Sequence, residues 1–370
     1  MTDTREKVRI RPDIAAMEAY TPTASLEVFA AQLGRPVEQV IKLDANENPY
    51  GPSAAARAAL ASLDAVHIYP DPEARMLRSM LAEYTGVDAR HILVGAGADE
   101  LIELILQAFI EPGDAIINTP PTFGMYGFDA PLYFARVVDV ERHADFSLDV
   151  EGIEAAARAT DAKLLFVCSP NNPDGGLIAP ETVERLLDLP LVVVLDEAYL
   201  EFSGAESLAG RAAASDNLIV LRTFSKWAGL AGLRVGYGIF PAGLMAHLWK
   251  IKQPYNLNVA ADAAARASLA DLPALRANVE RIIAQRRRLE RELAAVPFLA
   301  PYPSHSNFVL CRVVGLDAAA LKGRLAGEFG ILIRHYNKPR LRDHVRISAG
   351  TPEQIDALLA ALHTIGGDHA

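Results

Sequence analysis

Five short runs of apolar residues constrain the fold of this chain more than any other feature. They lack polar alternation and occur at residues 115–119, 163–169, 189–197, 217–225 and 234–240. A strand that is apolar on both faces is buried on both sides, so helices must cover both faces of the sheet. Helical patterns separate the runs, as expected where helices connect parallel strands. The runs therefore predict a large α/β domain with a mainly parallel sheet sandwiched by helices.

The C-terminal part of the chain has a different pattern. A charged helical segment at about 273–296 precedes three weaker strand patterns, SNFVLCR, ILIRHY and HVRISAG, and a last helix from Pro352. These segments predict a smaller α+β domain. Because 370 residues exceed the usual size of one core, two domains are expected. We place an N-terminal arm and entry segment at residues 1–45, the large domain at 46–262 and the small domain at 263–370.

Charge and composition exclude several classes of protein. The net charge of -10, without a basic stripe, argues against a nucleic-acid partner. Cys168 and Cys311 lie far apart and have no CxxC neighbourhood, so neither a disulfide framework nor a metal site is expected. The N-terminus MTDTREKVRIRPD lacks an apolar leader pattern, and the longest apolar runs are too short to span a bilayer. We therefore expect a cytoplasmic protein.

Polar motifs follow three of the apolar runs directly. They are SPNNPDG, DEAY and TFSK, and the carboxyl ends of parallel strands are where such sheets bind ligands. Lys226 of TFSK follows an apolar strand and precedes WAGLAGLRVGYGIF. A lysine in this position is most often a surface residue. A desolvated lysine, however, has a lowered pKa and the nucleophilic amine that Schiff-base formation requires.

Two of these motifs carry groups that suit a pyridine ring. Asp196 ends the strand LVVVL, where a buried carboxylate needs a cation such as a pyridinium nitrogen. Capping a helix or pairing with an arginine is an alternative role for it. Tyr199 follows three residues later, and Asn172 lies in the turn sequence NNPDG. The Asn172 amide can donate to a phenolate oxygen, so the two strand ends together suit a hydroxypyridine ligand.

A glycine-rich turn and two residues near Lys226 suit a phosphate group. The turn opens a long apolar helix in VGAGADELIELILQAF, and the free N–H groups of a helix N-terminus attract anions. Asp99 and Glu100 could alternatively only complement the helix dipole. Ser225 precedes Lys226 and Arg234 follows it by eight residues, and both are suitable phosphate ligands.

The ordered motifs carry a family resemblance. The series NPYGP, IYPDPEARMLR, GAGADELI, PPTFGMY, SPNNPDG, DEAYLEF, TFSKWAGLAGLRVGY and VRISAG extends from Asn46 to Gly350. It resembles the fold-type I pyridoxal-phosphate-dependent aminotransferases, most closely the histidinol-phosphate aminotransferases. The resemblance implies a seven-stranded sheet in the large domain, pyridoxal 5'-phosphate as cofactor, and a homodimer with shared active sites.

The resemblance also implies roles for individual residues. It makes Lys226 the Schiff-base lysine and proton carrier, with Asp196 on the pyridine nitrogen and Tyr199 and Asn172 on the phenolic oxygen. Phe123 is implied to stack on the cofactor ring. The implied phosphate ligands are Ala98, Asp99, Thr223, Ser225, Arg234 and, from the partner subunit, Tyr69.

Four residues are implied to bind the substrates. Arg346 corresponds to the arginine for the substrate carboxylate, Arg334 to one associated with a phosphate-bearing substrate, and Tyr20 and Asn46 to further contacts. Tyr20 lies in AYTPTASLE, where many histidinol-phosphate enzymes have a glycine after the proline.

The implied reaction is the transamination of L-histidinol phosphate with 2-oxoglutarate in histidine biosynthesis. An aromatic amino-acid aminotransferase and a threonine-phosphate decarboxylase are the alternatives. A non-catalytic regulator would need a DNA-binding unit, for which the N-terminal arm is too short.

Overall fold

The larger of two β-sheets is mainly parallel. The computed structural model describes residues 10–19 and 25–367. Strand β8 is antiparallel to both of its neighbours, and the other strand pairs are parallel. The strand order is β2 (Ile92–Gly95), β8 (Gly236–Ile239), β7 (Leu218–Thr223), β6 (Val192–Asp196), β5 (Leu164–Cys168), β3 (Ala115–Asn118) and β4 (Arg136–Asp139). The predicted seven-stranded, mainly parallel sheet is therefore confirmed.

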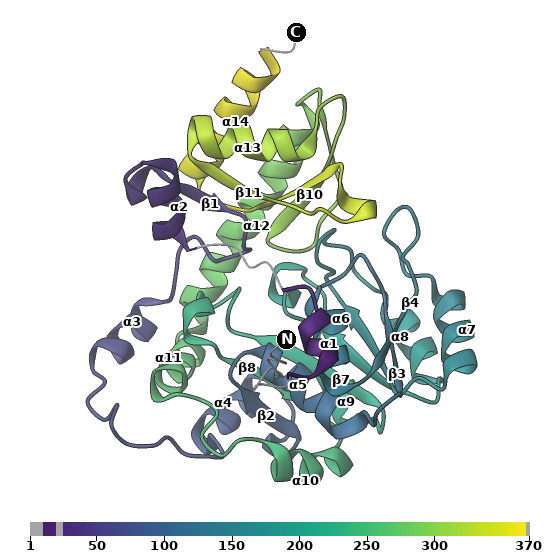
Figure 1. Cartoon of the computed structure of the whole chain (residues 1–370). Coiled ribbons are helices and arrows are strands. Elements are labelled where there is room, and N and C mark those ends of the chain that lie inside the picture. The colour runs from purple at the N-terminus through teal and green to yellow at the C-terminus, as the bar shows by residue number, and fades with distance from the viewer. Residues whose placement is uncertain (1–9, 20–24, 368–370) are drawn as a thin grey trace, which may run out of the picture.

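Helices lie on both faces of this sheet, as the two-sided apolar pattern of the strands requires (Figure 1). All residues of β3 and β5 are buried, because helices cover both faces of the sheet at these strands. The helices of this part are α3 (Ala54–Ala61), α4 (Arg75–Thr85), α5 (Ala98–Phe109), α6 (Met125–Asp129), α7 (Val150–Thr160), α8 (Pro180–Leu187), α9 (Ala209–Ala213), α10 (Ala242–Ile251) and α11 (Val259–Ala270). Because helices cover both faces, the polar ends of the strands are the part of the sheet where a ligand can bind.

The smaller sheet combines the C-terminal strands with one strand from the N-terminal segment. Its order is β1 (Ile41–Leu43), β11 (Ile331–His335), β12 (His344–Ser348), β10 (Phe308–Val313) and β9 (Leu299–Pro301). The β1 strand is parallel to β11, whereas the other pairs are antiparallel. The helices beside this sheet are α2 (Leu26–Leu33), α13 (Ala318–Phe329) and α14 (Pro352–Gly367), whereas the short α1 (Pro12–Ala16) lies near α6 of the larger part (Figure 1). Part of the predicted entry segment thus belongs to the C-terminal sheet.

The long helix α12 (Leu272–Ala294) connects the two hydrophobic cores. Val279 and Ile282 in its N-terminal half pack in the larger core, and Leu289 and Leu293 pack in the smaller one. Its residues 273–294 coincide with the predicted charged helix. The predicted domain boundary between residues 262 and 263 falls inside α11, and the division of the chain into domains stays a prediction. Among the described residues, no helix is long and apolar enough to cross a bilayer.

The smaller core gives a direct test of the packing. Leu293 is fully buried there, so Leu293→Ala leaves a cavity and should lower the free energy of unfolding by about 2–5 kcal/mol. Val314→Ala, at a position 48% exposed, should change it by no more than about 0.5 kcal/mol. Urea unfolding followed by circular dichroism measures both, and equal losses in the two variants would contradict this packing.

Candidate active site between the two sheets

Two adjoining cavities lie at the carboxyl edge of the larger sheet. The larger has a volume of about 660 Å³, and residues of both sheets and of the N-terminal segment line it. The smaller has a volume of about 140 Å³, and it lies against the strand ends and the start of α5. Phe123, Tyr199 and Lys226 line both cavities, so the two form one continuous site with the lysine at their junction.

Lys226 presents a partly desolvated amine to both cavities. It follows β7 by three residues, and its Nζ donates a hydrogen bond to the carbonyl oxygen of Ala45 at 3.2 Å. Burial lowers the pKa of Lys226 to about 8, and the nearby Arg346 guanidinium contributes to the same shift. A neutral, nucleophilic amine is therefore more populated at neutral pH than for an exposed lysine.

Asp196 is a buried carboxylate at the far wall of the smaller cavity. It ends β6 and is 4% exposed. Its Oδ2 accepts a hydrogen bond from the Tyr126 hydroxyl at 2.6 Å, and its Oδ1 accepts one from the backbone N–H of Ala198 at 3.0 Å. Burial raises the pKa of Asp196 to about 6. A cationic partner in the cavity would favour the ionised form.

A hydrogen-bond network joins the larger cavity to the smaller sheet. The Tyr199 hydroxyl accepts a hydrogen bond from Asn46 Nδ2 at 3.1 Å. Arg346, on β12, donates to Asn172 Oδ1 at 2.6 Å and to the carbonyl oxygen of Asp44 at 2.7 Å. The network thus brings together four residues that the sequence predicted for one site, and it ties both sheets to the N-terminal segment.

The start of α5 forms a narrow concave surface against β8. Gly97, the residue before the helix, has a φ of 84° and provides no side-chain cap. A Cβ atom on Gly97 would lie 2.7 Å from Arg234 Nη2, and one on Gly236 would lie 2.6 Å from the backbone nitrogen of Ala98. Only glycine fits here, which leaves the first N–H groups of α5 facing the smaller cavity, as in an anion site.

The predicted phosphate ligands surround this surface. Ala98, Asp99, Thr223, Ser225 and Arg234 all line the smaller cavity. The Asp99 carboxylate pairs with Arg234 Nη2 at 2.6 Å, so the side chain of Asp99 orients the arginine. The Thr223 hydroxyl accepts a hydrogen bond from the Ser225 N–H at 3.0 Å. Cationic, hydroxyl and backbone N–H donors therefore converge on one small volume.

Comparison with known proteins identifies the family. The family model described as aminotransferase class I and II matches residues 38–362. The chain belongs to this family. A histidinol-phosphate aminotransferase of Roseiflexus castenholzii is 54% identical over 364 residues, which cover 96% of this chain and 98% of the relative. A chloroplastic histidinol-phosphate aminotransferase of Nicotiana plumbaginifolia is 52% identical, over 95% of this chain and 86% of the relative.

A solved structure of the same family has a closely similar fold. It is the histidinol-phosphate aminotransferase from Sinorhizobium meliloti in complex with pyridoxal-5'-phosphate. The TM-score is 0.90 at 30% sequence identity, with all of both chains covered.

Tyr69 is the one predicted site residue among the described residues that does not line the cavities of this aminotransferase. Tyr69 is 76% exposed, and its ring stacks on that of Tyr255 with 4.4 Å between centroids. Tyr20 lies outside the described residues. Arg334 does line the larger cavity, with its guanidinium 5.4 Å from the ring centroid of Tyr336. Arg346, the other predicted arginine for substrate, also lines this cavity and is 6% exposed.

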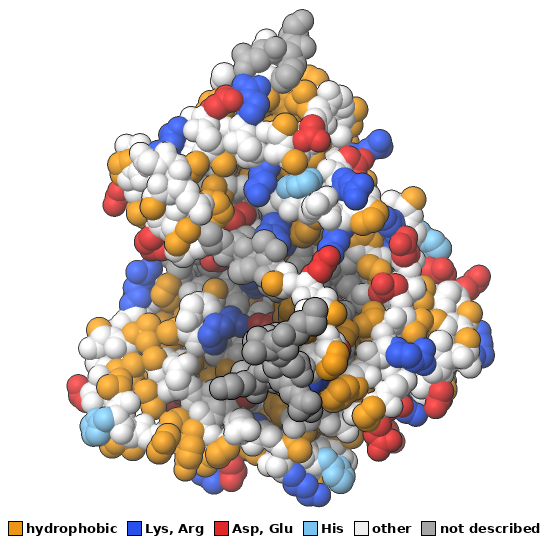
Figure 2. Space-filling model, in the orientation of Figure 1, with side chains coloured by type: hydrophobic (Ala, Val, Ile, Leu, Met, Phe, Trp, Pro, Cys, Tyr) orange, Lys and Arg blue, Asp and Glu red, His pale blue; other side chains and the backbone are white. Residues whose placement is uncertain are grey.

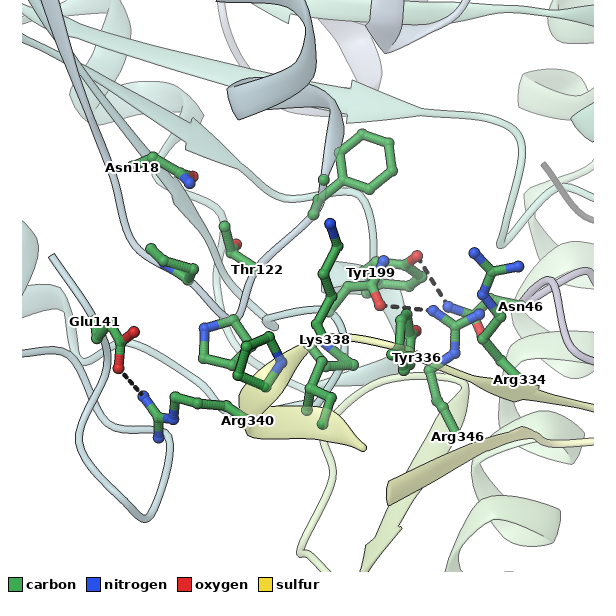
Figure 3. Close-up of a pocket in the computed structure, with 18 of the residues that line it drawn as sticks. Asn46, Asn118, Thr122, Glu141, Tyr199, Arg334, Tyr336, Lys338, Arg340 and Arg346 are labelled. Carbon is green, nitrogen blue, oxygen red and sulfur yellow. Dashed lines mark hydrogen bonds and ion pairs between the residues drawn. The ribbon is translucent and has the colours of Figure 1, made fainter. Parts of the chain in front are cut away.

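Several residues of the aminotransferase site were not predicted from the sequence. Tyr126 follows Phe123 by three residues in the motif PTFGMY. This short spacing is the sequence feature that could have indicated Tyr126 as a site residue. Lys338 and Arg340 line the larger cavity from the segment between the two predicted arginines (Figure 3). Glu141 lies opposite Arg340 in the same view. Nothing in the sequence pattern placed the segment after β4 beside the segment after β11.

The lowered pKa of Lys226 predicts its reactivity. In the cofactor-free aminotransferase, acetylation of Lys226 should reach half its maximal rate near pH 8, because only the neutral amine reacts. Lys163 is the reference, since its partner Asp161 raises the pKa of that amine. Peptide mass spectrometry across a pH series measures both rates.

A variant of the neighbouring arginine provides the control. Arg346→Met removes a positive charge that lowers the Lys226 pKa, so the midpoint should move to higher pH. A Lys226 midpoint equal to that of Lys163 in the unchanged protein would contradict the desolvated amine.

Proposed function

We propose that this chain transfers the amino group of L-histidinol phosphate to 2-oxoglutarate, with pyridoxal 5'-phosphate as cofactor. The observation that carries the proposal is the position of Lys226 at the junction of the two cavities, between a phosphate-type cradle and the arginines of the larger cavity. The names of the Roseiflexus castenholzii and Nicotiana plumbaginifolia relatives support histidinol phosphate as the amino donor.

The smaller cavity fits the cofactor by the chemistry of its walls. Gly97 and Gly236 let Arg234 and β8 pack closely against the N-terminus of α5, and Arg234 adds a cation for the phosphate. At the other wall, Asp196 is a buried carboxylate suited to a protonated ring nitrogen. Phe123 lines the same cavity and offers an aromatic face for the ring.

The proposed roles of Tyr199 and Asn172 follow from the hydrogen-bond donors that their contacts within the protein do not use. The Tyr199 hydroxyl accepts from Asn46, so its own proton can be donated to the phenolic oxygen. Asn172 accepts from Arg346 through Oδ1, which leaves its amide nitrogen to donate to the same oxygen. When bound, the cofactor supplies a ring that withdraws electrons from the substrate's Cα.

Lys226 holds the cofactor covalently and, once released, moves the proton of the substrate's Cα. Its pKa of about 8 before cofactor binding lies near the working pH, as suits a group that both accepts and returns a proton. Asp196 keeps the proton on the ring nitrogen. Arg346 binds the carboxylate of the acceptor, and Arg334, Asn46 and Tyr20 bind the phosphorylated donor.

We also propose a homodimer in which Tyr69 reaches the phosphate site of the partner subunit. Tyr69 stacks on Tyr255, which is also exposed, and Val66, Ile68 and Met76 are exposed apolar residues near Tyr69 in the sequence. Exposed apolar groups of this kind suit a subunit interface. A cytoplasmic location is part of the proposal, and the free, buried Cys168 and Cys311 suit a reducing compartment.

The covalent role of Lys226 predicts a specific mass change. Borohydride reduction of the holoprotein should fix the cofactor's mass on the peptide that contains Lys226, and Lys226→Ala should lose that mass. Activity of Lys226→Ala should fall by at least about a thousandfold, because one residue holds the cofactor and moves the proton. Cofactor mass on another lysine would overturn this role.

The choice of donor is tested in the same preparation. Histidinol phosphate should give the highest kcat/KM of three compounds, the others being phenylalanine and threonine phosphate. A faster reaction with phenylalanine would make the chain an aromatic aminotransferase, and release of carbon dioxide from threonine phosphate would make it a decarboxylase.

Mixed dimers test whether the active sites are shared. Lys226→Ala and Tyr69→Ala each impair the site, but a hybrid of the two has one site with both native residues. Unfolding and refolding an equal mixture should restore about a quarter of the native activity, since half of the dimers are hybrids. Activity no higher than the sum of the two separate variants would contradict the exchange of Tyr69.

A further inference from the structure

Lys338 is a cationic side chain of the larger cavity that the proposed mechanism does not use. It lies between β11 and β12, directly before the short 3-10 turn η6 (Pro339–Leu341), and it lines the cavity (Figure 3). Within residues 10–19 and 25–367, its ammonium group has no hydrogen bond or ion pair. A charged group without a partner at the wall of a binding cavity is available to a ligand.

The backbone that carries Lys338 is fixed from both sides. The N–H of Leu341 donates to the carbonyl oxygen of Lys338 at 2.9 Å, and the Leu341 side chain packs with Phe146 and Leu310. Arg340 donates to the backbone carbonyl of Arg142 and, at 2.8 Å, to that of His143. The turn is therefore anchored on the loop after β4, across the cavity from its own sheet.

The carboxylates of the cavity wall are already engaged by other groups. Glu141 faces Arg340 at 3.6 Å, Asp139 accepts from Asn118 at 2.8 Å, and Asp44 faces Lys42 at 3.1 Å. Arg346 donates to two neutral oxygen atoms, so these contacts do not neutralise its charge. The unpaired ammonium of Lys338 thus adds to a positive cavity, and Lys and Arg side chains gather around the hollow between the sheets (Figure 2).

We infer that Lys338 is a specificity-determining residue that binds the phosphate of the amino donor. The inference rests on the proposed function, because the donor named there carries a phosphate dianion that needs more than one positive charge. Arg340 and Leu341 act through Lys338 as positioning residues, since they fix the turn from which it extends. Lysine suits this position because a flexible stem and a compact ammonium reach a phosphate without a fixed planar geometry.

The test compares a phosphorylated donor with the same donor lacking phosphate. Lys338→Met keeps the length of the side chain and removes its charge. For histidinol phosphate, kcat/KM should fall by about tenfold to a hundredfold, mainly through KM, as for loss of one charge-assisted contact. For histidinol, kcat/KM should stay within about twofold. Lys338→Arg should recover most of the loss, because it restores the charge.

Inorganic phosphate provides a second measurement that does not depend on turnover of histidinol. It should inhibit the holoenzyme in competition with the donor, and its inhibition constant should rise by a similar factor in Lys338→Met and return in Lys338→Arg. Lys322→Met is the matched control, because Lys322 is an exposed residue of α13 outside the cavity. That variant should leave all of these constants unchanged.

Two kinds of result would overturn the inference. An equal loss with histidinol phosphate and histidinol would mean that Lys338 only supports the fold, and unchanged constants in Lys338→Met would mean that it binds no phosphate. Failure of the proposed function is distinguishable from both, because the unchanged protein would then not transaminate histidinol phosphate at all.

Discussion

The structure depends on keeping ionisable groups out of water at one edge of a buried parallel sheet. The strands that form this sheet are covered on both faces, so their polar residues occur where the strands end. Asp196 and Lys226 meet there with pKa values near 6 and 8, closer together than those of exposed carboxyl and amino groups. Burial, which is the largest cause of both shifts, thus makes both groups responsive to a charged ligand.

The smaller sheet completes this site through its contacts with the segment before the larger sheet. Arg346 reaches across to Asn172 and Asp44, and Asn46 is held by Ser348 and Asn307. Asn46 itself has a φ of 55°, a conformation that asparagine tolerates better than most residues. Hydrogen bonds from the smaller sheet therefore hold both cofactor-side and substrate-side residues, and neither sheet alone contains a whole site.

Much of the larger sheet and its site could be predicted because sequence order and spatial order coincide there. Five apolar runs correspond to strands, and polar residues directly after a parallel strand must lie at the same edge. The β2 and β4 strands were not predicted. Each has four residues, and β4 carries exposed charged residues, Arg136 and Asp139, at its two ends.

Contacts between segments far apart in the sequence could not be predicted in this way. The hydrogen bond from Tyr126 to Asp196 depends on how α6 packs over the end of β6, for which periodicity gives no register. Lys338 and Arg340 appeared as two more basic residues of a charged loop. Their position in the cavity follows from the packing of Leu341 against Phe146, whose left-handed φ of 67° no propensity indicates for phenylalanine.

The pairing of β1 with β11 has a consequence for how the chain folds. Ile41 lies beside Ile331 in this sheet, although the whole larger sheet separates them in the sequence. During synthesis, the N-terminal strand emerges from the ribosome long before its partner, and the ends of a long loop must meet before this contact forms. The larger sheet can assemble while the smaller one still lacks its strands. The C-terminal strands are thus translated after the larger sheet, and their arrival gives β1 its partner and completes the wall of the catalytic pocket.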